Sequence, residues 1–203
     1  MFTRLSNFSY GNYQIANISS TEMNVDTQLL IQIQKYETEC LRLLLGENLY
    51  TDLMSNLELD GLYWKVKSGS DAKWSSLLNG VSYPDPCDNT KNITWRGILN
   101  KVATVQGTEV IECLTAPYVF FYYSLNTRTS NVGVGEVRLK ADNTTQESSK
   151  NKRVDAWNEF VQWSSYGFSD SNVSLFQFLN DNFQEYNNGC SFLNLQTMTY
   201  YDI

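Results

Sequence analysis

An apolar stripe in VDTQLLIQIQKYETECLRLLLGENLY, the segment from Val25 to Tyr50, constrains the fold more than any other feature of the sequence. Its members recur every three or four positions, as on the buried face of an amphipathic helix: Leu29, Leu30, Ile33, Tyr36, Cys40, Leu41 and Leu44. Gly46 is a natural C-terminal stop for this helix, and a second short helix is expected from Glu47 to about Leu57. Because a single glycine joins the two helices, the chain must turn sharply there and the helices must pack together.

Four further segments have helical patterns, namely 71–80, 108–126, 148–166 and 174–186. In the second of these, Pro117 either kinks the helix or opens a new one after Thr115. The segment SYPDPCDNTKN, which begins at Ser82, holds two prolines and several turn-forming residues. We expect it to be an exposed loop without regular structure.

The remaining segments are polar or extended in character. GEVRLKADN is expected to form a loop or a short hairpin arm, while the tail CSFLNLQTMTYYDI has strand-like composition and no helical stripe. An apolar, β-prone tail needs a neighbour to pair with. The predicted fold class is therefore mainly α. It consists of a small helical bundle at 21–187 with a protruding loop or short β-hairpin at 127–145, an extended N-terminal segment at 1–20 and an extended C-terminal arm at 188–203.

Composition and charge narrow the classes of function. A chain of 203 residues, 42% of them hydrophobic, can bury one good core. Only 18% of the residues are charged, and the neutral polar surface that results suits contact with other proteins, although an AT-rich genome would produce the same Asn and Tyr bias. The net charge of -7 argues against general attraction to nucleic acid or to an anionic membrane. No secretion signal or stretch of roughly 20 apolar residues is evident, so no membrane partner is expected.

The sequence offers little catalytic chemistry. Histidine is absent and the four cysteines form no CxxC pair, which removes most zinc sites and the His-activated nucleophiles. Cys40 and Cys113 lie at apolar positions and are interpreted as small core residues. The carboxylates Glu37 and Glu39 are interpreted as part of a solvated helix face, and GVGEV lacks the context of a phosphate-binding loop. No enzyme activity, metal site or cofactor is predicted.

The run YVFFYYSLNTRTSNVGVGEV, from Tyr118 to Val137, joins a dense aromatic half to a polar half that contains glycine. The aromatic residues favour core or subunit-interface packing over a base-stacking platform, because such platforms lie in basic grooves. Basic residues cluster on both sides of this loop, at Arg128, Arg138, Lys140, Lys150, Lys152 and Arg153. They form either an ordinary solvated face or a contact with an acidic partner or DNA backbone.

Several motifs occur together in a characteristic order: LIQIQKYETECLRLLLGENLYTDL near the start, WSSLLNGVSY from Trp74, WRGIL from Trp95, YVFFYYSLN followed by TRTSNVGVGEVRLKADNTT, and VDAWNEFV from Val154. In this order the chain resembles the head-to-tail connector (adaptor) proteins of tailed bacteriophages. It is most similar to versions found in crAss-like and other Bacteroidetes-type phages.

This resemblance implies a virion structural protein that forms a homo-oligomeric ring, commonly of twelve copies, beneath the portal protein. Such rings assemble in the host cytoplasm, lie in the virion neck, extend the channel through which genomic DNA passes, and offer a platform for other neck or tail proteins. Two segments would carry these contacts. The subunit-interface or lumen loop that the resemblance implies contains Thr127, Arg128, Asn131, Gly133, Gly135, Arg138 and Lys140. The implied arm, which binds the portal or a neighbour, contains Phe192, Leu193, Leu195, Met198, Tyr200, Tyr201 and Ile203.

Two other hypotheses remain open from the sequence. The chain is alternatively a non-enzymatic soluble scaffolding or regulatory module that binds a partner protein through its aromatic face. An enzyme with a carboxylate or cysteine site is the third hypothesis, and it requires a concave pocket in which such side chains converge.

Overall fold

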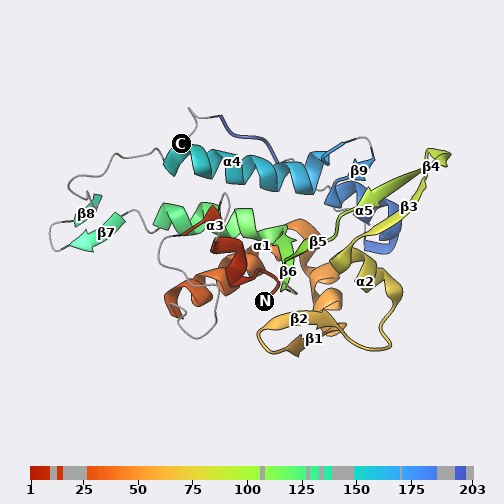
Figure 1. Ribbon diagram of the computed structural model, residues 1–203, viewed down its shortest axis with the longest axis horizontal. Helices are drawn as coiled ribbons and strands as arrows, with labels where there is room; N and C mark the ends of the chain where they lie inside the picture. The colour runs from red at the N-terminus through yellow and green to blue at the C-terminus, as the bar shows by residue number, and fades with distance from the viewer. Residues whose placement is uncertain are drawn as a thin grey trace.

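The computed structural model in Figure 1 describes residues 1–9, 13–15, 27–105, 108–126, 129–132, 135–138, 149–169, 171–186 and 195–199. Helices and short strands alternate along the chain, so the fold is a mixture of α and β structure. The prediction of a mainly α bundle is therefore wrong. The error lies in the middle of the chain, where two segments interpreted as loop and helix are strands.

The helices have the following bounds: α1 (Thr27–Ser55), α2 (Ala72–Asn79), α3 (Thr115–Asn126), α4 (Ser149–Val161) and α5 (Leu175–Asn182). Short helical turns accompany them at η1 (Leu5–Phe8), η4 (Gln162–Tyr166) and η5 (Gln184–Tyr186). α3 packs between α1 and α4, and these helices form a layer that runs along the long axis of the molecule (Figure 1).

The strands pair in small sheets. They are β1 (Leu57–Asp60) with β2 (Tyr63–Val66); β3 (Val81–Asp85), β4 (Asp88–Trp95) and β9 (Asn172–Val173) in the order β3-β4-β9; β5 (Leu99–Val105) with β6 (Thr108–Cys113); and β7 (Thr129–Val132) with β8 (Gly135–Arg138). All of these pairs are antiparallel except the short parallel pair of β4 with β9.

The expected glycine break is present in α1. Gly46 has a φ of 73° and a ψ of 163°, which divides α1 into two helical parts at the predicted position. Local caps likewise explain the limits of α2, because the Asp71 side chain accepts a hydrogen bond from the Lys73 backbone N–H at 2.9 Å and Gly80 follows the last turn. α5 begins where the Ser174 hydroxyl accepts from the backbone N–H of Gln177.

The proline-containing segment that was expected to be a loop is a β-hairpin. β3 is an edge strand, and the register of its pairing with β4 shifts between Pro84 and Asp85. Proline is tolerated at such positions, because an edge strand or a bulge does not require every backbone N–H. The Asp85 carboxylate then accepts a hydrogen bond from the backbone N–H of Cys87, which closes the turn.

The expected helix over 108–126 is wrong in its first third. β6 occupies Thr108–Cys113, and it pairs with β5 from Leu99 opposite Cys113 to Val105 opposite Thr108. α3 then begins at Thr115, which agrees with the alternative in which a new helix opens near Pro117. The β-branched residues of β6 favour a strand, whereas the apolar run that follows continues without a polar break and conceals the boundary.

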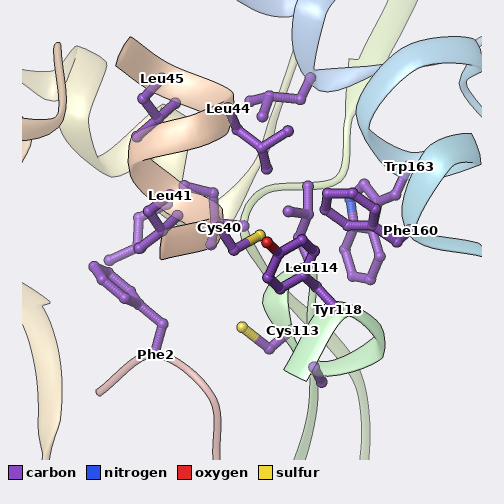
Figure 2. Packing of buried hydrophobic residues seen from close by; sticks show 14 of the residues in the cluster. Phe2, Cys40, Leu41, Leu44, Leu45, Cys113, Leu114, Tyr118, Phe160 and Trp163 are labelled. Atoms are coloured by element: carbon purple, nitrogen blue, oxygen red, sulfur yellow. The ribbon is translucent and has the colours of Figure 1, made fainter. Parts of the chain in front are cut away.

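The buried core is one contiguous cluster in which the N-terminal segment takes part. Phe2, Leu5 and Phe8 are almost fully buried, which supplies contacts that the sequence left open for this segment. Figure 2 shows Phe2 beside residues of α1, and Tyr118 of α3 facing the α4 side of the core. Cys40 and Cys113 are buried in this cluster, so their interpretation as core residues is confirmed.

Candidate functional site

The polar half of the Tyr118–Val137 run forms the β7–β8 hairpin. Its strands pair from Thr129 opposite Arg138 to Val132 opposite Gly135. In Figure 1 the hairpin lies beyond the end of α3, apart from the helical layer. The segment is therefore a β-hairpin. Its strands contain three of the predicted interface residues, namely Asn131, Gly135 and Arg138. Thr127, Arg128, Gly133 and Lys140 lie outside the described residues.

The described part of the C-terminal arm, 195–199, follows α4 of the same chain (Figure 1). The Asn158 side chain pairs with both backbone polar groups of Met198: its Nδ2 donates to the carbonyl oxygen at 3.0 Å, and its Oδ1 accepts from the N–H at 2.7 Å. The indole Nε1 of Trp157 donates to the carbonyl oxygen of Gln196 at 2.9 Å. Side chains on α4 therefore bind the backbone of an extended segment.

The side chains of this segment differ in exposure. Leu195 is 9% exposed and belongs to the hydrophobic core, whereas Gln196, Thr197 and Thr199 are exposed. Met198 is half-buried. Phe192, Leu193, Tyr200, Tyr201 and Ile203, the other predicted arm residues, lie outside the described residues. The described arm is thus bound mainly through its main chain, and this mode of binding makes little demand on side-chain identity.

Sequence reasoning missed Asn158 as the residue that binds the arm. Trp157 lies within the helical pattern expected over 148–166, and its ring packs against Phe121 of α3 at 5.1 Å between centroids. Asn158 had no such signal, because a single amide on a polar helix face is ordinary. Asparagine is a poor helix former, so its position in the interior of α4 is the one sequence feature that points to a special role for Asn158.

A buried polar cluster joins the N-terminal segment to α1 and α3. The Glu37 Oε2 atom accepts hydrogen bonds from the backbone N–H groups of Phe2 at 2.9 Å and Thr3 at 2.6 Å. The hydroxyl groups of Thr3 and Thr115 are 2.6 Å apart, and the Cys113 Sγ lies 3.0 Å from the Thr115 hydroxyl. Glu37 is 4% exposed, so its interpretation as part of a solvated helix face is wrong. Arg153 of α4 is 5% exposed, so a solvated face is wrong for that basic residue as well.

The chemistry of this cluster is that of an anchor. Burial raises the pKa of the Glu37 carboxyl, although the hydrogen bonds from Thr3 and Phe2 oppose the shift. Burial also raises the pKa of the Cys113 thiol to about 11 and that of Cys40 well above its usual range. A thiol with such a pKa is protonated at neutral pH and is a poor nucleophile. The cluster therefore stabilises the N-terminal segment and offers no activated group.

Within the part of the chain that the structure describes, no three His, Cys, Asp or Glu side chains converge as metal ligands would. In the same described residues, no helix is both long enough and apolar enough to cross a membrane. The aromatic residues of α3 pack internally: Tyr118, Phe120 and Phe121 are buried, and Tyr122 is half-buried. The structure therefore supports core packing for these aromatic residues.

Comparison of the chain with protein-family models, with curated proteins and with solved structures gave no significant match.

Proposed function

We propose that the chain is a structural subunit of a bacteriophage virion, a ring-forming head-to-tail adaptor that docks on the portal and extends the DNA channel. In this proposal it also provides a platform for tail or further neck proteins. The observation that carries the proposal is the β7–β8 hairpin, which extends beyond α3 and away from the helical layer (Figure 1). A two-stranded hairpin is marginal by itself in water, so a projecting one is best explained by contact with another chain.

The C-terminal segment supports the same proposal in a second way. Asn158 and Trp157 bind the backbone of this segment while most of its described side chains remain exposed. In this proposal the exposed side chains of Gln196 and Thr197 contact a portal protein or a neighbouring subunit. A ring requires two different faces on each subunit, and the hairpin and the arm are distinct elements that can serve on such faces.

The charge of the chain is compatible with a DNA conduit. A net charge of -7 gives genomic DNA no general electrostatic attraction to the ring. Strong neutralisation of phosphates by many basic side chains would retain DNA by counterion release. DNA passing through such a lumen is therefore expected to slide without sequence-specific contacts.

The aromatic-face alternative has less support. The aromatic residues of α3 bury most of their surface against α1 and α4, as the 5.1 Å separation of the Tyr118 and Phe160 rings illustrates. A partner that bound through these aromatics would have to displace part of the core. We therefore make no proposal of a partner site on α3.

Mass photometry and negative-stain microscopy of the purified chain, alone and mixed with the portal protein encoded in the same genome, test the proposal. We expect rings, commonly of twelve chains of 23.3 kDa each, that form on or with the portal. A matched variant replaces 129–138 with a short Gly-Ser linker and keeps every described core residue. It should remain folded by circular dichroism and lose ring closure. A wild-type chain that stays monomeric and never joins the portal would overturn the proposal.

A further inference from the structure

An open cleft of about 440 Å³ lies between the N-terminal segment, the β1–β2 hairpin, the end of α2 and the β5–β6 pair. The N-terminal segment is held at this cleft because the Trp64 backbone N–H donates to the Met1 carbonyl oxygen at 3.1 Å. The volume is within the range of ligand sites in proteins. None of the functions discussed above uses this cleft.

The polar lining of the cleft is basic. Arg4, Lys65 and Lys101 line it, and none of the described residues that line it is acidic. The residues that line the cleft are therefore cationic although the chain has a net charge of -7, and the carboxylates of Glu58 and Asp60 lie beside Lys65. The Arg4 guanidinium lies over the Tyr63 ring at 5.0 Å, which holds it at the rim of the cleft.

The existing partners of Lys65 leave it able to bind a further anion. Its Nζ atom lies 3.5 Å from carboxylate oxygens of both Glu58 and Asp60. All three side chains are about half exposed or more. Ion pairs of this exposed kind contribute little free energy, so an incoming carboxylate can share or replace them.

The floor of the cleft is apolar. Trp64, Leu99 and Ile111 contribute to it. Leu59 faces Trp64 across the β1–β2 pair, on the same face of the hairpin, and Leu59 is 58% exposed. An exposed leucine beside a half-buried tryptophan extends the apolar floor beyond the cleft itself.

We propose that this cleft binds an acidic protein segment that carries leucine or aromatic side chains, with carboxylates at Arg4, Lys65 and Lys101 and apolar side chains on Trp64 and Leu59. The segment is that of a partner protein. Charge complementarity and the apolar floor together favour this occupant. Nucleic acid fits less well, because its backbone requires an extended basic track and its bases require several stacking surfaces. The proposal does not depend on ring formation.

Fluorescence anisotropy with labelled peptides tests this binding. The main probe is a short peptide that alternates Glu with Leu and Phe. One comparison peptide replaces Glu with Lys, a second replaces Leu and Phe with Ser, and a single-stranded oligothymidylate is the nucleic-acid probe. We expect the main probe to bind most tightly and to bind more weakly at high salt. Equal binding of the serine peptide, or tighter binding of the oligothymidylate, would overturn the proposal.

Substitutions locate the binding on the protein. Lys101→Glu and Leu59→Ser should each weaken binding of the main probe, by about fivefold or more. Lys91→Glu is the matched control, because Lys91 is an exposed lysine on β4 away from the cleft, with 72% of its side chain accessible. Lys65→Glu provides a second charge reversal if Lys101→Glu disturbs folding of its strand. An effect of Lys91→Glu equal to the effects of the cleft variants would show that binding is not at this site.

Discussion

The side-chain amide of Asn158 pairs with Met198 in the manner of a neighbouring β-strand, with one hydrogen bond to the backbone N–H and one to the backbone carbonyl oxygen. The residues are 40 positions apart in the sequence. A helix thus satisfies the main chain of an extended segment that has no strand partner among the described residues. Together with the Trp157 indole, which donates to the Gln196 carbonyl oxygen, this amide holds the segment from 195 to 199 on α4.

Asn158→Ala should loosen the contact between α4 and Met198. The substitution removes two hydrogen bonds, each worth about 1 kcal/mol, and leaves the helix itself intact because alanine is a good helix former. We expect the amide of Met198 to exchange with solvent at least about tenfold faster, as measured by hydrogen-deuterium exchange. Asn158→Asp keeps the acceptor for the Met198 N–H but places a carboxylate oxygen against the Met198 carbonyl oxygen, so it should also speed exchange.

Asn79→Ala is the control for this experiment. Asn79 is likewise an asparagine in a helix. It is exposed, and its Nδ2 donates to the Ser75 hydroxyl at 3.3 Å, away from the arm. Exchange at Met198 should be unchanged in this variant. If Asn158→Ala also leaves the exchange of 195–199 unchanged, the amide pairing does not hold the arm.

Thiol reactivity tests the interpretation of the cysteines. In a Cys190→Ser background, the exposed Cys87 should react with a maleimide in the native protein, whereas Cys40 and Cys113 should not. Burial raises the pKa of Cys113 to about 11, so little thiolate exists at neutral pH. Mass spectrometry after labelling should show a second and third modification only in denaturant. Rapid native labelling of Cys113 would favour the enzyme hypothesis again.

The helical parts of the fold could be predicted because their signals are long and local. The stripe of α1, its break at Gly46 and the pattern of α4 each extend over several turns. The strands could not be found in the same way. Two prolines indicated a loop over β3 and the turn after it. Pro84 lies in β3, where the edge position of the strand makes it tolerable, and Pro86 lies in the turn that follows. That position depends on pairing with β4, which no local pattern reveals.

The helical spacing of Glu37 predicts that this residue is buried. It lies four residues after Ile33 and four before Leu41, and both of these residues belong to the buried stripe of α1. A residue at that position faces the core in a helix. Its hydrogen-bond donors, however, are backbone groups 34 and 35 positions away. The burial of Glu37 was thus predictable from spacing, whereas its role as an anchor was not.

Glu37→Gln should change how the free energy of unfolding depends on pH. Burial raises the pKa of Glu37 above its value of about 4.3 in the unfolded chain. The native state therefore binds this proton more tightly, so the stability contributed by this group is fully present below the unfolded pKa and is lost as pH rises through the folded pKa. The neighbouring Met1 amino group favours the carboxylate and opposes part of this shift.

Denaturant titrations of the wild type and Glu37→Gln across this pH range measure the difference. The wild-type free energy of unfolding, relative to that of the variant, should fall from about pH 4 upward and then become constant. Glu39→Gln is the matched control on the same helix, since Glu39 is outside the buried polar cluster and more exposed. A wild-type difference that rises with pH would mean that hydrogen bonding to the carboxylate outweighs burial.

Gly97→Ala should be among the most destabilising single substitutions in the chain. A Cβ atom at Gly97 would lie 2.5 Å from the backbone nitrogen of Gly80, and one at Gly80 would lie 2.6 Å from the Trp95 carbonyl oxygen. The end of α2 therefore crosses the end of β4 with no room for a side chain on either backbone. Because both sides of this contact are main chain, neither can move aside without disturbing the strand pairing.

Gly69→Ala separates this steric effect from the backbone conformation. Gly69 has a φ of +84°, close to the +90° of Gly97, but its Cβ would meet nothing within 4 Å. It should lose about 1 kcal/mol of stability from the left-handed conformation alone, whereas Gly97→Ala should lose about 3 kcal/mol or more. Equal losses in thermal or denaturant unfolding would contradict the close crossing.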